Sequence, residues 1–80
     1  MPKLKSLDSS EIIKILEYFG FTISSQKGSH IKLVKQTSFQ KQVLTIPNHK
    51  ELKKGTIKAI FNQASRFISS EDLEKYFYTE

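Results

Sequence analysis

The spacing of apolar residues changes twice along this 80-residue chain, and this change constrains the fold more than any other feature. Apolar residues recur at helical spacing before residue 20, alternate with polar residues through much of 21–46, and return to helical spacing after residue 55. Short alternating segments that end in turn residues are typical of β-strands. The chain is therefore expected to form a helix, a group of strands and at least one further helix.

The first helix is expected to begin at Asp8, Ser9 and Ser10, which precede Glu11 in a typical helix-start pattern. Gly20 is expected to end this helix. The apolar face of the helix would be formed by Ile12, Ile13, Ile15, Leu16 and Phe19.

Three strands are expected, over residues 21–26, 29–35 and 41–46. Lys27 and Gly28 supply a tight turn between the first two, which predicts a β-hairpin. A polar loop precedes the third strand, and Pro47 is expected to stop that strand because proline cannot donate a ladder hydrogen bond.

A second main helix is expected from Gly55 and Thr56 onward, with an apolar stripe of Ile57, Ile60, Phe61, Ala64 and Ile68. A short C-terminal helix is expected over 70–78, because Ser69 and Ser70 precede two acidic residues. Leu73 and Phe77 are expected to join the core. For Tyr76 and Tyr78, packing on the core and contact with a partner are both open.

The resulting order, α-β-β-β-α(-α), predicts an α+β fold in which helices cover one face of a three-stranded antiparallel sheet. The opposite face would be open. The length suits a single domain over residues 1–80. The chain has no cysteine, so neither a disulfide nor a thiolate zinc site can stabilise it, and hydrophobic packing must do so.

Strand side chains alternate between the two faces of a sheet, which allows each strand residue to be assigned a side. The residues expected to face the helices are Phe21, Ile23, Ile31, Leu33, Leu44 and Ile46. Those expected to point outward are Thr22, Ser24, Gln26, His30, Lys32 and Thr45. The assignment holds for a regular hairpin, because one bulge would invert part of it.

The formal net charge of +5 is compatible with a polyanionic partner such as nucleic acid, and equally with a lysine-rich surface that only keeps the protein soluble. No apolar run is long enough to span a bilayer, and the N-terminus lacks the apolar core of a signal peptide. We therefore expect a cytoplasmic protein without a membrane partner.

Three motifs occur in a fixed order: Lys27-Gly28-Ser29-His30 after Gly20-Phe21, then Ile46-Pro47-Asn48-His49, then Glu51-Leu52-Lys53-Lys54-Gly55-Thr56-Ile57 at the start of a helix. Together, from Leu7 to about Leu73, they resemble the HicA toxin family. In one position the chain departs from many relatives, which carry a second histidine where this chain has Ile31.

The resemblance implies a fold like that of a double-stranded-RNA-binding domain, and the toxin of a type II toxin–antitoxin system. It implies a ribosome-independent mRNA interferase, that is, an endoribonuclease acting on mRNA, with His30 as its catalytic residue. It further implies a HicB-like antitoxin partner that covers the His30 face, and no metal or other cofactor.

His30 suits this role because imidazole can both take and give a proton near neutral pH. The alternative is a strand histidine that only satisfies a hydrogen bond. The backbone of Gly28, the hydroxyl of Ser29 and the cations of Lys27 and Lys32 are expected to contact phosphate. A second catalytic group is not fixed by the sequence, which offers Ser29, Lys27, Lys32 or water.

A second group of cations, at the start of the second main helix, is the candidate for docking the RNA backbone. This group consists of Lys50, Lys53, Lys54 and Lys58, and an ordinary solvated face is the alternative for it. His49 is expected to shape a turn rather than to bind metal. For the whole chain, a non-catalytic RNA-binding module and a small protein-interaction domain remain the competing functions.

Overall fold

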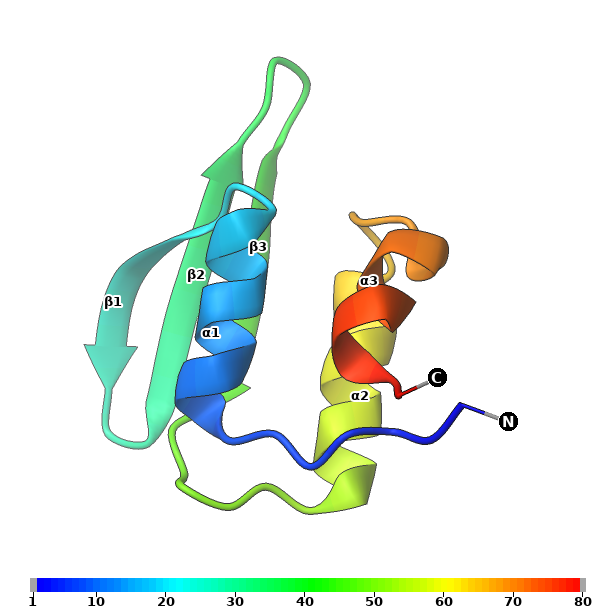
Figure 1. Ribbon diagram of the computed structural model, residues 1–80. Coiled ribbons are helices and arrows are strands. Elements are labelled where there is room, and N and C mark those ends of the chain that lie inside the picture. The colour runs from blue at the N-terminus through cyan, green and yellow to red at the C-terminus, as the bar shows by residue number, and fades with distance from the viewer. Residues whose placement is uncertain (1, 80) are drawn as a thin grey trace.

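The computed structural model describes residues 2–79 and has an α+β fold, as predicted. In chain order the elements are α1 (Ser9–Tyr18), β1 (Thr22–Lys27), β2 (His30–Gln36), β3 (Lys41–Pro47), α2 (Lys54–Ala64) and α3 (Ser70–Phe77). The strands form one antiparallel sheet in the order β1-β2-β3. Figure 1 shows α1 across one face of this sheet, with α2 beside it and α3 packed on α2.

The start of α1 is fixed by a reciprocal capping arrangement, as the sequence predicts. The Asp8 carboxylate accepts the Glu11 N–H at 2.9 Å, and the Glu11 carboxylate accepts the Asp8 N–H at 3.0 Å. The Glu11 N–H, with the Ser10 hydroxyl, favours the ionised Asp8 carboxylate and lowers its pKa. The two hydrogen bonds between Asp8 and Glu11 therefore fix the start of α1 at the place that the sequence pattern predicts.

The end of α1 is set by Gly20, whose φ of +98° lies in the region that favours glycine. Lys35 of β2 covers this end. Its Nζ donates to the Phe19 carbonyl at 2.9 Å, and its Cε would lie 3.1 Å from a Cβ added at Gly20. Glycine is therefore required here by conformation, and the flexible end of the Lys35 side chain packs closely against it.

The core lies between the sheet and the helices. In the sheet, Ile31 lies opposite Ile46 and Leu33 opposite Leu44, and all four are buried, as predicted. The helices and connections bury Leu7, Ile12, Leu16, Phe21, Ile57, Ile60, Phe61, Ala64, Ile68, Leu73 and Phe77 against them. The helix α2 is shorter than its apolar stripe suggested, because it ends at Ala64 while Ile68 is buried in the following turn.

A β-bulge at Ser24 interrupts β1. Ile23 lies opposite Leu33, but the next pair joins Ser25 to Lys32, so one residue of β1 has no partner. Directly opposite residues share a face of the sheet. The extra residue therefore reverses the alternation over the rest of β1.

The structure corrects two expectations for β1, the side of Gln26 and the burial of Ile23. Gln26 lies opposite the buried Ile31, so the expectation that it shares the outward side was wrong. Ile23 keeps the helix-facing side but is 50% exposed, because β1 is the edge strand beyond the cover of α1 (Figure 1). Hydrophobic alternation gives no signal for an edge strand that the helices do not reach.

The C-terminal helix α3 is fastened to the N-terminal segment. The Lys5 N–H donates to the Phe77 carbonyl at 2.8 Å, and the Thr79 N–H donates to the Lys3 carbonyl at 2.7 Å. The half-buried Tyr76 packs edge-on against Phe19, with ring centroids 5.5 Å apart. Within residues 2–79, no helix is long and apolar enough to cross a membrane.

Candidate active site

His30 is the first residue of β2 and lies on the side of the sheet that the helices leave open. The following residue, Ile31, is buried among the helices, so the alternation directs His30 outward. Lys27 lies opposite it on β1 and Pro47 opposite it on β3. The imidazole is exposed and makes no hydrogen bond or ion pair with another residue of 2–79. Both ring nitrogens are therefore free for a ligand.

The turn before His30 consists of Gly28 and Ser29, one residue later than predicted, because Lys27 still belongs to β1. Gly28 has a φ of +60°, and among residues 2–79 only glycines have a positive φ. Glycine in the first central position is the requirement of a type II′ turn. A Cβ at Gly28 would meet nothing within 4 Å. Conformation alone requires this glycine, and the turn surface stays open to a ligand.

The turn is anchored from behind by the loop after β3 and the start of α1. The Ser29 carbonyl accepts the Asn48 N–H at 2.6 Å. The Ser9 hydroxyl accepts the His49 N–H at 2.8 Å and lies 2.5 Å from the Pro47 carbonyl and 2.8 Å from that of His49, either of which can accept its proton. Ser9 is 3% exposed. Three elements are thus joined directly beneath His30.

Sequence reasoning identified Ser9 only as part of a helix start. Its bonds reach 38 and 40 residues along the chain, and no local signal marks such a contact. For His49, both backbone groups bind Ser9, and this fixes the loop in place. The arrangement agrees with the expectation that His49 shapes a turn.

The outer face of the sheet, as defined by strand pairing, consists of Thr22, Ser25, Lys27, His30, Lys32, Val34, Gln36, Lys41, Val43, Thr45 and Pro47. The fold brings Lys27 and Lys32 to this face beside His30. Both side chains are exposed. The sequence has no Asp or Glu between Glu17 and Glu51, so no carboxylate of the sheet or its loops offsets these cations. The outer face is therefore suited to an anion.

The predicted cations of α2 lie on a different element from His30. Lys53 is the N-cap residue, with no hydrogen bond from its side chain to the helix end. Lys54 donates to the Leu4 carbonyl, and Lys58 donates to the Tyr78 hydroxyl at 2.8 Å. The starts of β2 and α2 lie at the same end of the molecule (Figure 1). Lys54 and Lys58 already have partners within the fold, whereas Lys27 and Lys32 project from the outer face.

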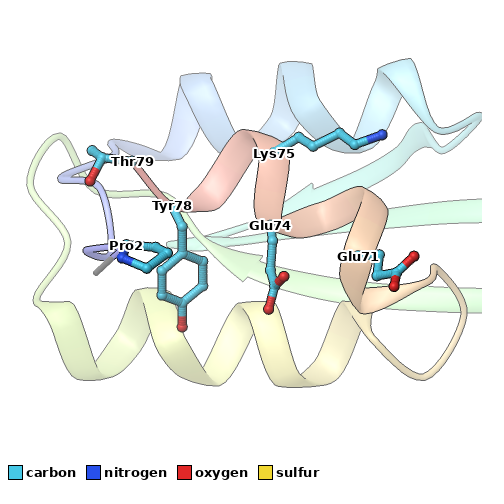
Figure 2. A pocket seen from close by; sticks show the side chains of 6 residues that line it. All are labelled: Pro2, Glu71, Glu74, Lys75, Tyr78 and Thr79. Atoms are coloured by element: carbon cyan, nitrogen blue, oxygen red, sulfur yellow. The ribbon is translucent and has the colours of Figure 1, made fainter.

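A hollow of about 490 Å³ lies away from His30 and the sheet, between the N-terminal segment and α3. Pro2, Glu71, Glu74, Lys75, Tyr78 and Thr79 line it. Figure 2 shows Glu74 and Tyr78 extending from α3 toward α2, while Lys75 points the other way. Two carboxylates in its wall make this hollow unfavourable for a phosphate.

The His30 region can perform proton transfer on a large substrate. Its imidazole can accept or donate a proton, and Lys27 and Lys32 can stabilise negative charge that develops nearby. It lies on an exposed face, where a polymer can approach, rather than in an enclosed pocket of the kind that holds small ligands. Among residues 2–79, no three His, Cys, Asp or Glu side chains are grouped so as to hold a metal ion.

Comparison with known protein families identifies the family of this chain. Residues 9–65 match the family described as HicA toxin of bacterial toxin–antitoxin, from the first residue of α1 to the residue that caps α2. The matched segment includes the Gly28–Ser29 turn, His30 and the Ser9 anchor. No curated protein and no solved structure gave a significant match.

Proposed function

The chain belongs to the HicA toxin family of bacterial toxin–antitoxin systems, and from this membership we propose that it is a ribosome-independent endoribonuclease that cuts mRNA in the cytoplasm with His30. The 80 residues would act as one toxin domain. The observation that carries the proposal is the exposed, unpartnered imidazole of His30, flanked by Lys27 and Lys32 on a face without carboxylates.

The reaction uses the substrate's own 2′-hydroxyl as the nucleophile. Its oxygen forms a bond to the adjacent phosphorus, and the bond from phosphorus to the 5′-oxygen breaks, which leaves a 2′,3′-cyclic phosphate and a 5′-hydroxyl. His30 takes the proton of the 2′-hydroxyl or donates one to the leaving 5′-oxygen, and water carries out the other proton transfer. Lys27 and Lys32 stabilise the additional negative charge on the phosphoryl oxygens.

The residues around His30 have supporting parts in this scheme. The open Gly28–Ser29 turn lets a phosphate approach the backbone, and the Ser29 hydroxyl is a further donor. Lys53, at the start of α2, is free to dock the RNA backbone more remotely. Lys54 and Lys58 join it only if they leave their partners in the fold. Because α-β-β-β-α order and a basic surface also suit RNA binding alone, a non-catalytic module of the double-stranded-RNA-binding type is the alternative.

An antitoxin partner is implied by the family, and we assign its contact to the outer face. A HicB-like protein that covers His30, Lys27 and Lys32 would exclude RNA from the same surface. Such a partner would present carboxylates, because charge complementarity with a cationic face favours them.

Inducible expression in a bacterial host tests the proposed activity. Wild type should arrest growth and shorten transcripts, and transcripts should still shorten when translation initiation is blocked after the toxin has accumulated, because no ribosome is needed. The His30→Ala chain, produced at the same level, should leave growth and transcripts intact. Growth arrest with intact transcripts would contradict ribonuclease action and favour the binding module.

The phosphate contacts of Lys27 and Lys32 are tested by the salt dependence of RNA binding. Each contact to a single strand contributes about −0.7 to the slope of log K against log salt concentration. Replacing both by Gln in a His30→Ala background should therefore make the slope less negative by about 1.4. Equilibrium binding of a labelled single-stranded RNA across a salt series measures this change.

The control for this experiment removes the same charge elsewhere. Lys14 on α1 and Lys75 on α3 are exposed and lie off the outer face. Their double replacement by Gln should leave the slope close to that of the parent. Equal slopes for the parent and the Lys27/Lys32 variant would remove these two residues from the phosphate contacts.

A further inference from the structure

Phe39 is the most exposed large apolar residue in the described chain, at 96% of its possible surface. It lies at the tip of the connection between β2 and β3, which projects beyond the rest of the molecule (Figure 1). The proposed chemistry at His30 makes no use of this ring. A single exposed apolar residue needs no explanation by itself, but an aromatic ring beside a cationic face is the kind of group on which unpaired bases stack.

The backbone that carries Phe39 is held in one arrangement. The Thr37 N–H donates to the Gln40 carbonyl at 2.9 Å. The Thr37 hydroxyl oxygen accepts the N–H groups of Phe39 and Gln40, at 3.2 and 3.1 Å. None of these bonds involves the ring. The hairpin thus presents the aromatic side chain on an ordered support, and removing the ring should leave the support unchanged.

The outer face connects His30 with this hairpin without interruption. Lys32 follows His30 along the same side of β2, and Val34 lies next, opposite Val43. Gln36, opposite Lys41, completes the row at the base of the hairpin. Cations at both ends and an apolar pair between them, with no carboxylate, match the general pattern of proteins that bind single-stranded nucleic acid.

The length of this path sets the scale of the ligand. His30 and Gln36 are six residue steps apart on β2, which at about 3.3 Å per step gives roughly 20 Å. One strand of duplex DNA advances ~3.4 Å per nucleotide, and an extended single strand advances further, so this length corresponds to no more than about six nucleotides. A strand with its scissile phosphate at His30 would therefore reach the hairpin within about six nucleotides.

We propose that Phe39 stacks on an unpaired base of the RNA, distant from the cut, while the strand follows the outer face. The inference rests on the proposed function, since it names single-stranded RNA as the substrate class. A base is chosen over a protein side chain because the cationic row leads without interruption from His30, where the proposed reaction holds the RNA strand, to the base of the hairpin. Stacking is tolerant of sequence, so Phe39 adds affinity for long strands and orders them in one direction from His30.

The test measures binding of a 12-nucleotide single-stranded RNA in the His30→Ala background, where cutting does not interfere. Phe39→Ala should weaken binding by about 5- to 150-fold, the range for loss of one base–aromatic stack. Phe39→Tyr should restore most of the affinity because it retains the ring. Tyr18→Ala removes an exposed aromatic from α1, off the outer face, and should change affinity little.

Substrates that lack one base identify the contact directly. An abasic nucleotide moved along the RNA should weaken binding by the Phe39 protein at one position far from the cut. At that position the abasic substitution should not weaken RNA binding by the Phe39→Ala variant, because the partner ring is already absent. Equal losses in both proteins at every position would overturn the assignment.

A short RNA that spans only the cut separates this inference from the proposed function. With His30 intact, wild type and Phe39→Ala should cleave it at the same rate, since it cannot reach the hairpin. If wild type cleaves it but Phe39→Ala binds the long RNA as tightly as the parent, the stacking proposal is wrong and the nuclease proposal stands. If neither RNA is bound or cut, both are wrong. If the Phe39→Ala variant binds the long RNA as tightly as the parent but no longer binds its antitoxin, the ring contacts protein, and the stacking proposal is again wrong.

Discussion

Replacing His30 by Ala should lower the rate of RNA cleavage by roughly 10²–10⁴-fold, the usual contribution of one general acid or base. The fold should not change, because the imidazole is exposed and makes no hydrogen bond within residues 2–79. Single-turnover cleavage of a labelled RNA by purified wild type and variant measures the effect. Thermal unfolding of both proteins provides the control for folding.

RNA affinity distinguishes catalysis by His30 from a role in binding. The variant should bind single-stranded RNA within a few fold of wild type, since Lys27, Lys32 and the turn are unchanged. His30→Gln, which can form hydrogen bonds but cannot exchange a proton, should be nearly as slow as His30→Ala. A folded His30→Ala chain that cleaves RNA within about threefold of wild type would contradict the catalytic assignment.

Replacing Phe77 by Ala should lower the free energy of unfolding by about 3–5 kcal/mol, the usual cost of emptying a buried phenylalanine site. Phe77 is fully buried and packs edge-on against Phe61 of α2, with ring centroids 5.5 Å apart. Small domains are stable by about 5–15 kcal/mol, so the loss should consume much of the total. The effect is informative because α3 lies outside the family-matched segment 9–65.

Urea unfolding of the purified chain measures this change, with Phe39→Ala as the matched control. Phe39 is the same residue type but almost fully exposed, so its truncation should alter stability by no more than about 0.5 kcal/mol. Phe77→Leu retains most of the volume and gives a measurable protein if the Ala variant does not fold. A Phe77→Ala chain within 1 kcal/mol of wild type would show that α3 contributes little to the core.

The elements that sequence reasoning placed well are those with local signals. Asp8 and Glu11 mark a helix start because their bonds lie within one turn, and Gly20 marks its end through a conformation that other residues avoid. The burial of Ile31, Leu33, Leu44 and Ile46 also follows from alternation within each strand. These features depend on residues close together in the sequence, so local sequence patterns are sufficient to predict them.

The features that sequence reasoning missed depend on contacts distant in the chain. The bulge at Ser24 shifts the register by one residue, and no residue type in β1 signals it. Its consequence matters for the site, because it places Lys27 opposite His30 on the outer face. The anchoring bonds of Ser9 and the partner of Lys58 depend likewise on how remote elements pack. Phe39 is predicted only as part of a polar loop, although it is the most exposed large apolar residue within 2–79.

Two matched oligonucleotides test whether this HicA family toxin cuts RNA through the substrate's 2′-hydroxyl, with His30 as proton carrier. They are identical except that one carries a 2′-deoxynucleotide at the cut position, and both are incubated with purified protein without ribosomes. We expect the all-RNA strand to be cut there, leaving a 2′,3′-cyclic phosphate that mass spectrometry detects, and the deoxy strand to remain intact at that bond. Cleavage of both strands at equal rates, or of neither, would contradict the account.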